Sequence, residues 1–599
     1  MKKHFLILSA VSLCFSVARA QLTFTPVSNV SSIAFSGGDS EIEVADIDGD
    51  GDLDIATIGD HGSGIGGQQA GVMVFKNSGD GIAWSTVKSG NFGYGGIAIG
   101  DVNNDGKNDV GFAMHHQTAS GFGSKYMEVG LGDGTGSNWT AWDTDLSKEL
   151  DPNDPNTWGM FGSDFGDVNN DGNLDMASIS FGCCDGLRIY NNKGNGSWSA
   201  FPPKSMGNVL SSGYCMFGDF NNDGNLDLSA SGQGGLAFKN DGLGNFSSMS
   251  AGIPSDWTNK FDIGDVNNDG AKDIAVLSPG ISTGGRIVIF SYNKNTSKWD
   301  SISSGLPSAA DGIMAIALDD FDMDGKCDLA AWTVTSIDIY KGDGTGHFTA
   351  NGSAPNPISG SYGNRGLATG DFNHDGYTDI ASFNNTGANT LKVFLSNTTV
   401  HSLAVMPDFP HGQECFSSGS VQFVKWLASV PAGPKATVTI EFSSTGSTGP
   451  WSNVVTNAPN SGIFQWTVPA LVSTNCFLKY TVTQGTNVST MVMANAFSVG
   501  ACNATTSTGE VAQNASDFVI VPNPVCNNGS VQFTLQTASA VELSIFDMMG
   551  KEVVVLANES MAGTSHNIRI PSENMQPGIY FCKMTAGGKE QTQKLIIVK

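Results

Sequence analysis

The fold is decided by the stretch Asp46-Ile47-Asp48-Gly49-Asp50-Gly51-Asp52-Leu53-Asp54, because its pattern recurs six more times along the chain. Every copy has Asp at positions 1, 5 and 9, Gly at position 6, and Asp or Asn at position 3. The copies begin about 50 residues apart, a period typical of the four-stranded blades of a β-propeller. We number them loops one to seven, spanning residues 46–54, 101–109, 167–175, 219–227, 265–273, 320–328 and 371–379.

The residue types in each loop predict calcium binding. Calcium prefers six to eight oxygen ligands in a flexible cage. Positions 1, 3, 5 and 9 offer carboxylate or amide oxygens, the glycine at position 6 permits a tight turn, and the variable position 7 would use its backbone carbonyl. Asp, Asn and Gly also favour turns without any metal. A turn alone does not explain three invariant carboxylates in all seven copies, because their repulsion requires a counter-ion.

The candidate ligands are therefore five residues in each loop, and up to seven calcium ions are expected. They are Asp46, Asp48, Asp50, Asp52 and Asp54; Asp101, Asn103, Asp105, Lys107 and Asp109; Asp167, Asn169, Asp171, Asn173 and Asp175; Asp219, Asn221, Asp223, Asn225 and Asp227; Asp265, Asn267, Asp269, Ala271 and Asp273; Asp320, Asp322, Asp324, Lys326 and Asp328; and Asp371, Asn373, Asp375, Tyr377 and Asp379. Only loops one and six carry Asp at position 3, so ligand charge alone predicts tighter binding there.

The flanks of the loops predict an all-β fold with a seven-bladed propeller over residues 21–400. Positions 2 and 10 are apolar in every copy, as in Ile47 and Ile55, and a further strand, a glycine turn and an outer strand follow. The seventh repeat stops after Leu395 without an outer strand. Residues 21–25 are the candidate replacement, which would close the ring and leave no open sheet edge.

These loops resemble the FG-GAP/VCBS repeats of integrin α-subunit propellers and bacterial surface proteins, over roughly residues 30–397. The resemblance implies calcium in the loops of one propeller face and a binding surface on the opposite face. The sixth copy departs from the others because Asp319 replaces the Gly or Ala that precedes the loop elsewhere.

Residues 401–500 lack the calcium loop and show strand-like alternation, as in residues 436–442. The segment 462–469 resembles the immunoglobulin-like or fibronectin III-like spacers of secreted bacterial proteins, which implies a β-sandwich. Trp426, Trp451 and Trp466 suggest either core packing, which we favour, or a sugar-stacking platform. Residues 501–516 are rich in Thr, Ser, Asn and Ala and indicate a linker.

Residues 517–599 predict a last β-sandwich. The order of its motifs, from Pro522-Asn523-Pro524 to the basic-ended strand 594–599, resembles the C-terminal sorting domain of type IX secretion substrates. The resemblance implies a Gram-negative bacterium, passage through the periplasm and outer membrane with the secretion machinery as partner, and a secreted or surface-attached product. An ordinary terminal sandwich is the alternative.

The N-terminus predicts a signal peptide over residues 1–20, with Lys2 and Lys3, an apolar run and a small-x-small cleavage site. A lipid anchor at Cys14 is an alternative, although Leu13 fits it poorly. Cys415 with Cys476 or Cys502, and Cys526 with Cys582, are the candidate disulfides, against free buried thiols. No later segment predicts a transmembrane helix.

The net charge of −27, from 57 acidic and 30 basic residues, disfavours nucleic acid as a partner. No nucleophile elbow, zinc-protease motif or phosphate loop is present in the sequence. The sequence therefore favours a calcium-rigidified binding or adhesion module over an enzyme, with a glycan or an extracellular protein as its partner. A carbohydrate-active enzyme, a lyase or hydrolase on a calcium propeller, is the alternative.

Overall fold

We analysed a computed structural model of the chain. It describes residues 21–597 except 29, 31–40, 60–70, 94, 115–117, 119, 147–159, 181–186, 202–212, 232–235, 254–259, 278–285, 308–311, 334, 356–365, 384–390, 399, 401, 501, 503–514, 522–524, 526–528, 536–537, 548–550, 573–574, 577 and 587–588. The expected signal peptide, Cys14 and Cys526 lie outside the described residues.

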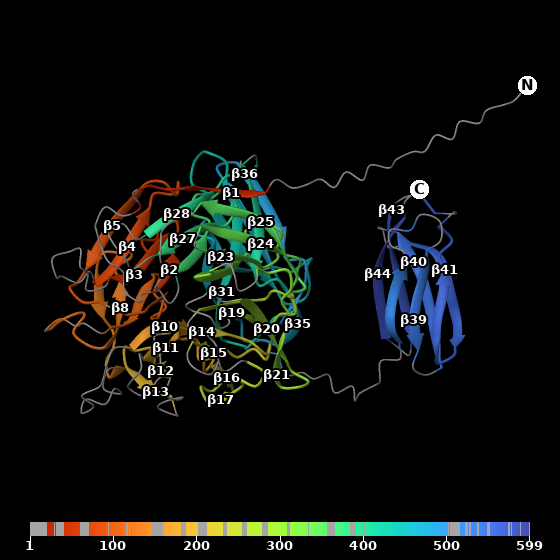
Figure 1. Cartoon of the computed structure of the whole chain (residues 1–599), viewed down its shortest axis with the longest axis horizontal. Helices are drawn as coiled ribbons and strands as arrows, with labels where there is room; N and C mark the ends of the chain where they lie inside the picture. Colours follow the sequence, from red (N-terminus) through yellow and green to blue (C-terminus); the bar gives the residue numbers. More distant parts are fainter. Residues whose placement is uncertain are drawn as a thin grey trace, which may run out of the picture. The chain divides into compact units, whose positions relative to one another are not determined.

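The described residues form β-strands and no α-helix, so the all-β prediction is confirmed (Figure 1). The chain divides into two compact units, Met1–Asn503 and Ala504–Lys599. Within the described ranges there is no helix long and apolar enough to cross a membrane.

The repeats fold into four-stranded antiparallel sheets of the kind that form propeller blades. Five of these sheets stand alone, and in each the strands follow chain order. They are β2 (Ile42–Ala45), β3 (Asp54–Gly59), β4 (Gly71–Asn77) and β5 (Trp84–Ser89); β6 (Ile97–Gly100), β7 (Asp109–Ala113), β8 (Met127–Gly132) and β9 (Trp139–Ala141); β10 (Met160–Gly166), β11 (Asp175–Ser180), β12 (Leu187–Asn192) and β13 (Trp198–Ala200); β14 (Cys215–Gly218), β15 (Asp227–Ala230), β16 (Leu236–Asn240) and β17 (Phe246–Ser248); and β18 (Phe261–Gly264), β19 (Asp273–Leu277), β20 (Ile287–Asn293) and β21 (Lys298–Ser301).

The sixth and seventh repeats join in one eight-stranded sheet, and the N-terminal strand makes the connection. β1 pairs antiparallel with β28, where Phe24 faces Ser396, and parallel with β25, where Leu22 faces Gly352. β1 therefore occupies the outer position missing from the last repeat, as the sequence predicts. The strands are β22 (Ala315–Asp319), β23 (Asp328–Trp332), β24 (Ser336–Gly342), β25 (Phe348–Pro355), β1 (Leu22–Pro26), β28 (Leu391–Ser396), β27 (Asp379–Phe383) and β26 (Leu367–Gly370).

Apolar side chains pack between neighbouring sheets, and the first and last repeats share one of these cores. Ile55 and Phe75 of the first repeat pack in a cluster with Phe372, Ala381 and Val393 of the last. The side chains at positions 2 and 10 of all seven loops are buried, which explains why these positions are apolar throughout.

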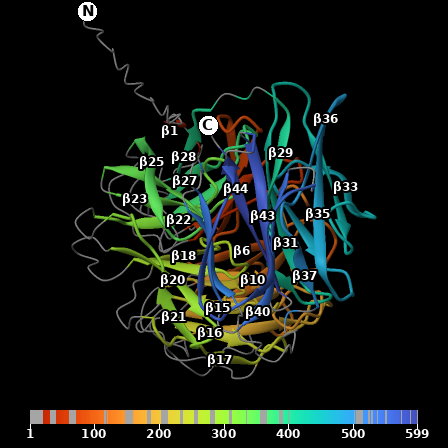
Figure 2. The ribbon, with the colours of Figure 1, turned by 90° about the vertical axis from the view of Figure 1, so that its right-hand side faces the viewer.

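The second β domain has a three-stranded and a six-stranded sheet (Figure 2). Trp426 and Trp466 are buried in its core beside Tyr480 and Phe497, so the prediction of core packing is confirmed for both and the sugar-platform alternative is wrong for them. The strands are β29 (Ala404–Phe409), β31 (Val421–Ser429) and β34 (Ile463–Thr467) in the first sheet, and β30 (Cys415–Phe416), β37 (Phe497–Val499), β35 (Ser473–Gln484), β32 (Thr437–Ser443), β33 (Ser452–Pro459) and β36 (Asn487–Val492) in the second.

One disulfide, Cys415–Cys502, fixes the end of this domain to β30, which selects one of the two predicted partners of Cys415. Cys476 is a buried free thiol. Cys582 is also a buried free thiol, so the predicted Cys526–Cys582 pairing is wrong.

The C-terminal unit consists of two facing sheets around the buried residues Phe533, Leu543, Ile545 and Leu595. Its strands are β38 (Ala515–Val521), β39 (Ser530–Leu535) and β42 (Ser565–Arg569) in one sheet, and β41 (Glu552–Met561), β40 (Ser539–Asp547), β43 (Gly578–Ala586) and β44 (Lys589–Ile597) in the other.

Candidate metal centres

Each of the seven loops connects the first two strands of a repeat and is held by its own aspartates. In loop two, Asp101 accepts hydrogen bonds from the backbone of Asp105 at 3.0 Å and of Gly106 at 2.7 Å. Asp109 accepts from Val102 at 3.0 Å and from Gly132 of the third strand at 2.8 Å. Positions 1 and 9 therefore shape the loop, and position 9 also ties the loop to its sheet.

Position 4 is a structural requirement that the pattern of the ligands did not reveal. The backbone there is left-handed in every copy, a conformation that favours Gly and Asn. The signal in the sequence is the Gly or Asn in five of the seven copies. The position 4 residues are Gly49, Asn104, Asn170, Asn222, Asn268, Met323 and His374, with φ between 50° and 74°.

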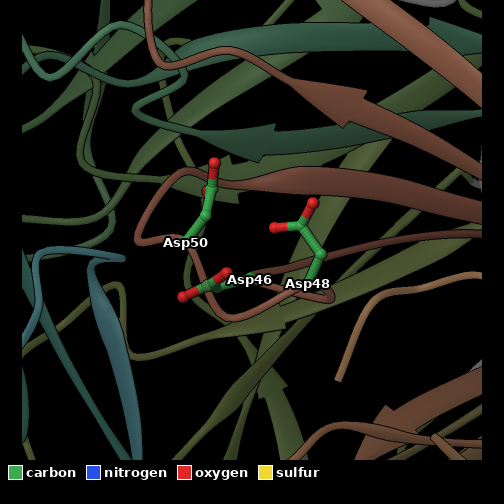
Figure 3. A group of neighbouring side chains, drawn as sticks. All are labelled: Asp46, Asp48 and Asp50. Atoms are coloured by element: carbon green, nitrogen blue, oxygen red, sulfur yellow. The ribbon is translucent and has the colours of Figure 1, made fainter. Parts of the chain in front are cut away.

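Three carboxylates come together in loop one and in loop six, the two loops that have Asp at position 3. Oxygens of Asp46, Asp48 and Asp50 lie within 4.8 Å of one another, and their side chains rise from a single turn (Figure 3). In loop six, oxygens of Asp320, Asp322 and Asp328 likewise lie within 4.8 Å of one another.

The electrostatics of these groups favours a bound cation. Burial, with repulsion from Asp50 and Asp48, raises the pKa of Asp46 to about 6. Burial likewise raises the pKa of Asp54 and of Asp328 to about 8. Among the described residues, Asp46 Oδ1 and Asp48 Oδ1 are buried without a hydrogen-bond partner. Clustered carboxylates with unused oxygens fit calcium, a hard cation that binds oxygen ligands.

The side chains at position 7 differ in their contacts from loop to loop. Asn173 and Asn225 donate their amides to the position 5 aspartates of their loops, at 2.8 and 3.0 Å. Asp52 pairs instead with His374 Nε2 and with Lys435 Nζ, both at 2.9 Å. Lys107 and Lys326 lie 3.8 and 4.0 Å from the position 5 aspartates of their loops. This arrangement is consistent with a backbone role for position 7.

The second β domain lies on the loops and covers this face of the repeats. Gln465 forms two hydrogen bonds with the backbone of Asp101, at 3.1 and 2.9 Å. The backbone of Val421 donates to Asp167 at 3.0 Å, and Val430 donates to the carbonyl of His374 at 2.8 Å. The domain therefore acts as a cap over the predicted calcium sites.

Loop four has the most extensive contacts with the cap. Asn222 accepts from the backbone of Cys415 at 2.7 Å and donates to the carbonyl of Gln413 at 2.9 Å. Ser417 donates to the carbonyl of Gly224 at 3.2 Å. The Cys415–Cys502 disulfide thus lies at the part of the cap that contacts this loop.

A cavity of about 1030 Å³, open to solvent, lies between the cap and the first strands of the repeats. Its apolar lining includes Ile99, Phe165 and Phe217 from the repeats and Phe423 and Phe464 from the cap.

Asp319, the residue that distinguishes the sixth copy, lies next to the cap. It lies in the wall of a smaller cavity of about 80 Å³ together with Asp408 and Lys425 of the cap. Burial and the charge of Asp408 raise the pKa of Asp319 to about 6, although Lys425 acts to lower it. The departure of the sixth copy from the repeat pattern is therefore a feature of the contact with the cap.

Removing the hydrogen bonds between Gln465 of the cap and Asp101 of loop two should lower the stability of the unit Met1–Asn503. Gln465→Ala removes both hydrogen bonds to Asp101, so we expect the free energy of unfolding to fall by about 1–3 kcal/mol. Chemical denaturation with intrinsic fluorescence measures the change. Thr467→Ala, at an exposed position of the same strand, is the matched control. Equal stabilities of the two variants would mean that the hydrogen bonds between Gln465 and Asp101 contribute nothing to stability.

Comparisons with known proteins identify two parts of the chain. Residues 167–230, 265–331 and 320–382 match the FG-GAP-like repeat. Residues 519–598 match the secretion system C-terminal sorting domain, which indicates export by type IX secretion to the cell surface or the extracellular space. No curated protein matches the chain significantly.

Several solved structures are similar at low identity. A lectin from Agrocybe aegerita that recognises non-reducing terminal N-acetylglucosamine is 17% identical, with a TM-score of 0.40, and the match covers 62% of this chain and 88% of the lectin. PorZ, a surface component of the type IX secretion system of Porphyromonas gingivalis, is 13% identical with a TM-score of 0.37, over 75% of this chain and 58% of PorZ. Sqt1 of Saccharomyces cerevisiae is 10% identical with a TM-score of 0.35, over 63% of this chain and 99% of Sqt1.

These likenesses are too distant to transfer a ligand or a partner. The loops and the terminal unit carry the assignment instead: the chain contains FG-GAP-like repeats and ends in a type IX secretion C-terminal sorting domain.

Proposed function

We propose that this protein is a seven-bladed, calcium-binding β-propeller that works as a binding or adhesion module outside the cell. The observation that carries the proposal is the grouping of loop carboxylates, such as Asp46, Asp48 and Asp50, with buried oxygens that have no hydrogen-bond partner among the described residues. The route outward is supported by the sorting domain, and a signal peptide at residues 1–20 would begin it.

Calcium would act here as a structural ion. The loops lie between strands that are almost fully buried, such as β3 and β7, and their position 9 aspartates are tied to third strands. An ion that neutralises these carboxylates would fix each loop and the surface on which the cap rests.

The cap covers the face of the repeats that carries the loops, and this limits where a partner can bind. The cap, which we propose to be an immunoglobulin- or fibronectin-like sandwich, contacts loops one, two, three, four, five and seven. We therefore propose that a glycan or an extracellular protein is recognised on the opposite face, which these contacts leave uncovered.

Calcium binding is tested by titrating chelator-treated, full-length protein with Ca²⁺ and counting bound ions by native mass spectrometry. We expect several ions and at most seven. Asp50→Asn should weaken binding at loop one, whereas Asp133→Asn, outside the loops, should bind as many ions as the wild type. Absence of bound calcium at millimolar Ca²⁺ would refute the proposal.

The binding role needs a separate test. Glycan arrays and immobilised extracellular proteins should be probed with and without Ca²⁺, beside assays for reducing sugars and unsaturated products. Retention on a ligand without product formation is expected. Catalytic turnover of a polysaccharide would instead support the carbohydrate-active enzyme that the sequence leaves as the alternative.

A further inference from the structure

The third strand of each repeat places one residue beside the calcium loop at a fixed register. The residue at position 10 of the loop pairs with an aromatic residue or glycine of the third strand, as Ile55 pairs with Phe75. The residue that follows this partner differs between the repeats. In order it is Lys76, Leu131, Asn191, Lys239, Ser291, Lys341 and Leu395.

The three lysines at this register contact the predicted ligands at positions 3 and 5. Lys239 Nζ lies 2.8 Å from Asp223 Oδ2 in loop four. Lys341 Nζ bonds to both Asp322 and Asp324 in loop six. In loop one, Lys76 Nζ is 3.5 Å from Asp48 Oδ2. Each ammonium group thus supplies part of the positive charge that calcium would bring.

Two of these contacts are direct hydrogen-bonded ion pairs. Lys341 bonds to the largely buried carboxylates of Asp322 and Asp324. Lys239 bonds to the largely buried carboxylate of Asp223. The position 7 lysines differ, because Lys107 and Lys326 lie 3.8 and 4.0 Å from the position 5 aspartates, beyond hydrogen-bond distance.

The lysines change the charge balance among the loops. Loops one and six have four aspartates at positions 1, 3, 5 and 9, so the third-strand lysine changes the formal charge from −4 to −3. In loop one, Lys435 of the cap also lies 3.3 Å from Asp50, but it pairs with Asp52 at position 7, and the charges of Lys435 and Asp52 offset each other. The value of −3 equals the charge of the Asn-containing loops two, three, five and seven at the same positions. Loop four has Asn221 at position 3 as well as Lys239, so its charge falls to −2. The advantage that ligand charge gives to loops one and six is therefore cancelled.

Loop four also differs in the orientation of its position 3 side chain. In loops two, three, five and seven the Asn oxygen accepts from the backbone of position 5, as Asn169 does from Asp171 at 3.1 Å. Asn221 instead directs its amide to Asp227 Oδ2 at 2.7 Å. Position 3 of loop four is thus engaged with the position 9 carboxylate.

We propose that the third-strand lysines set the order in which the loops take up calcium. Loops two, three, five and seven fill first: their formal charge equals that of loops one and six, but no lysine at this register occupies their carboxylate oxygens. Loops one and six follow, and loop four is the weakest site, by on the order of tenfold relative to the first class. This proposal rests on the calcium binding proposed above.

The test counts bound ions on the full-length protein at rising Ca²⁺ concentrations by native mass spectrometry. The wild type should show four ions in the first class. Lys239→Leu and Lys341→Leu introduce the residue found in repeats two and seven, so each should add one ion to that class. Leu131→Lys, the reciprocal change beside loop two, should remove one ion.

Two controls separate charge from other effects of substitution. Lys239→Arg keeps the positive charge and should behave as the wild type. Lys298→Leu removes an exposed lysine of β21 and should leave every count unchanged.

The outcomes distinguish the two proposals. If ions bind but Lys239→Leu and Lys341→Leu match the wild type at every Ca²⁺ concentration, the lysines do not set the order and this inference is overturned. The variants Asp48→Asn and Asp322→Asn give a second check. If each of them removed one ion from the first class, loops one and six would belong to that class, and this inference would be overturned too. If no form of the protein binds calcium, the proposed function itself fails, and the order fails with it.

Discussion

Chelation of calcium is expected to lower the melting temperature of the unit that ends at Asn503 by at least about 10 °C. An ion that binds only the folded state stabilises it, and each site filled at 100 times its Kd contributes about 2.7 kcal/mol. Without the ion, each loop keeps buried like charges together. Burial and the charges of Asp320, Asp322 and Asp324 already raise the pKa of Asp328 to about 8, which shows the cost of ionising it.

The measurement is differential scanning calorimetry of the full-length protein in Ca²⁺ and in EDTA. The C-terminal unit, Ala504–Lys599, contains none of the loops, so its transition serves as an internal control and should not move. Added Ca²⁺ should restore the first transition more effectively than Mg²⁺, which demands stricter octahedral geometry. Identical transitions in Ca²⁺ and EDTA would exclude a structural role for calcium.

The loops were predictable because their requirements are local. A left-handed turn at Gly106, aspartates at positions 1, 5 and 9, and an apolar residue such as Val102 all lie within nine residues. Each requirement restricts the residue type at one position, and seven copies in one chain made the restrictions visible.

The cap was not predictable because its contacts leave little trace in the sequence. Val421 and Val430 contact the loops through their backbone N–H groups, which every residue except proline has. The alternation of apolar and polar residues along 436–442 indicates that one face of this strand is buried. It does not indicate that the domain packs on the loops of the repeats.

The contacts of the third-strand lysines were hidden for a related reason. Lys76, Lys239 and Lys341 follow aromatic residues at different distances from their loops, since the connection between the second and third strands varies in length. Only the strand register brings them to equivalent places.

Deleting residues 21–28 is expected to be the most damaging small change to the repeats. β1 is hydrogen-bonded on both sides, to β28 and to β25, and it buries Leu22 and Phe24. Burial of two such side chains alone is worth about 3–6 kcal/mol. Their loss, together with two rows of unsatisfied strand hydrogen bonds, should lower the melting temperature by roughly 10 °C or more.

Calorimetry of the deletion variant measures this loss, and single substitutions localise it. Phe24→Ala should reproduce a large part of the effect, whereas Thr23→Ala, at an exposed position of β1, should change little. A synthetic peptide of residues 21–28 should bind the deletion variant and restore its melting temperature, because an open strand edge accepts an added strand. A deletion variant that melts with the wild type would show that β1 contributes nothing to closing the last repeat.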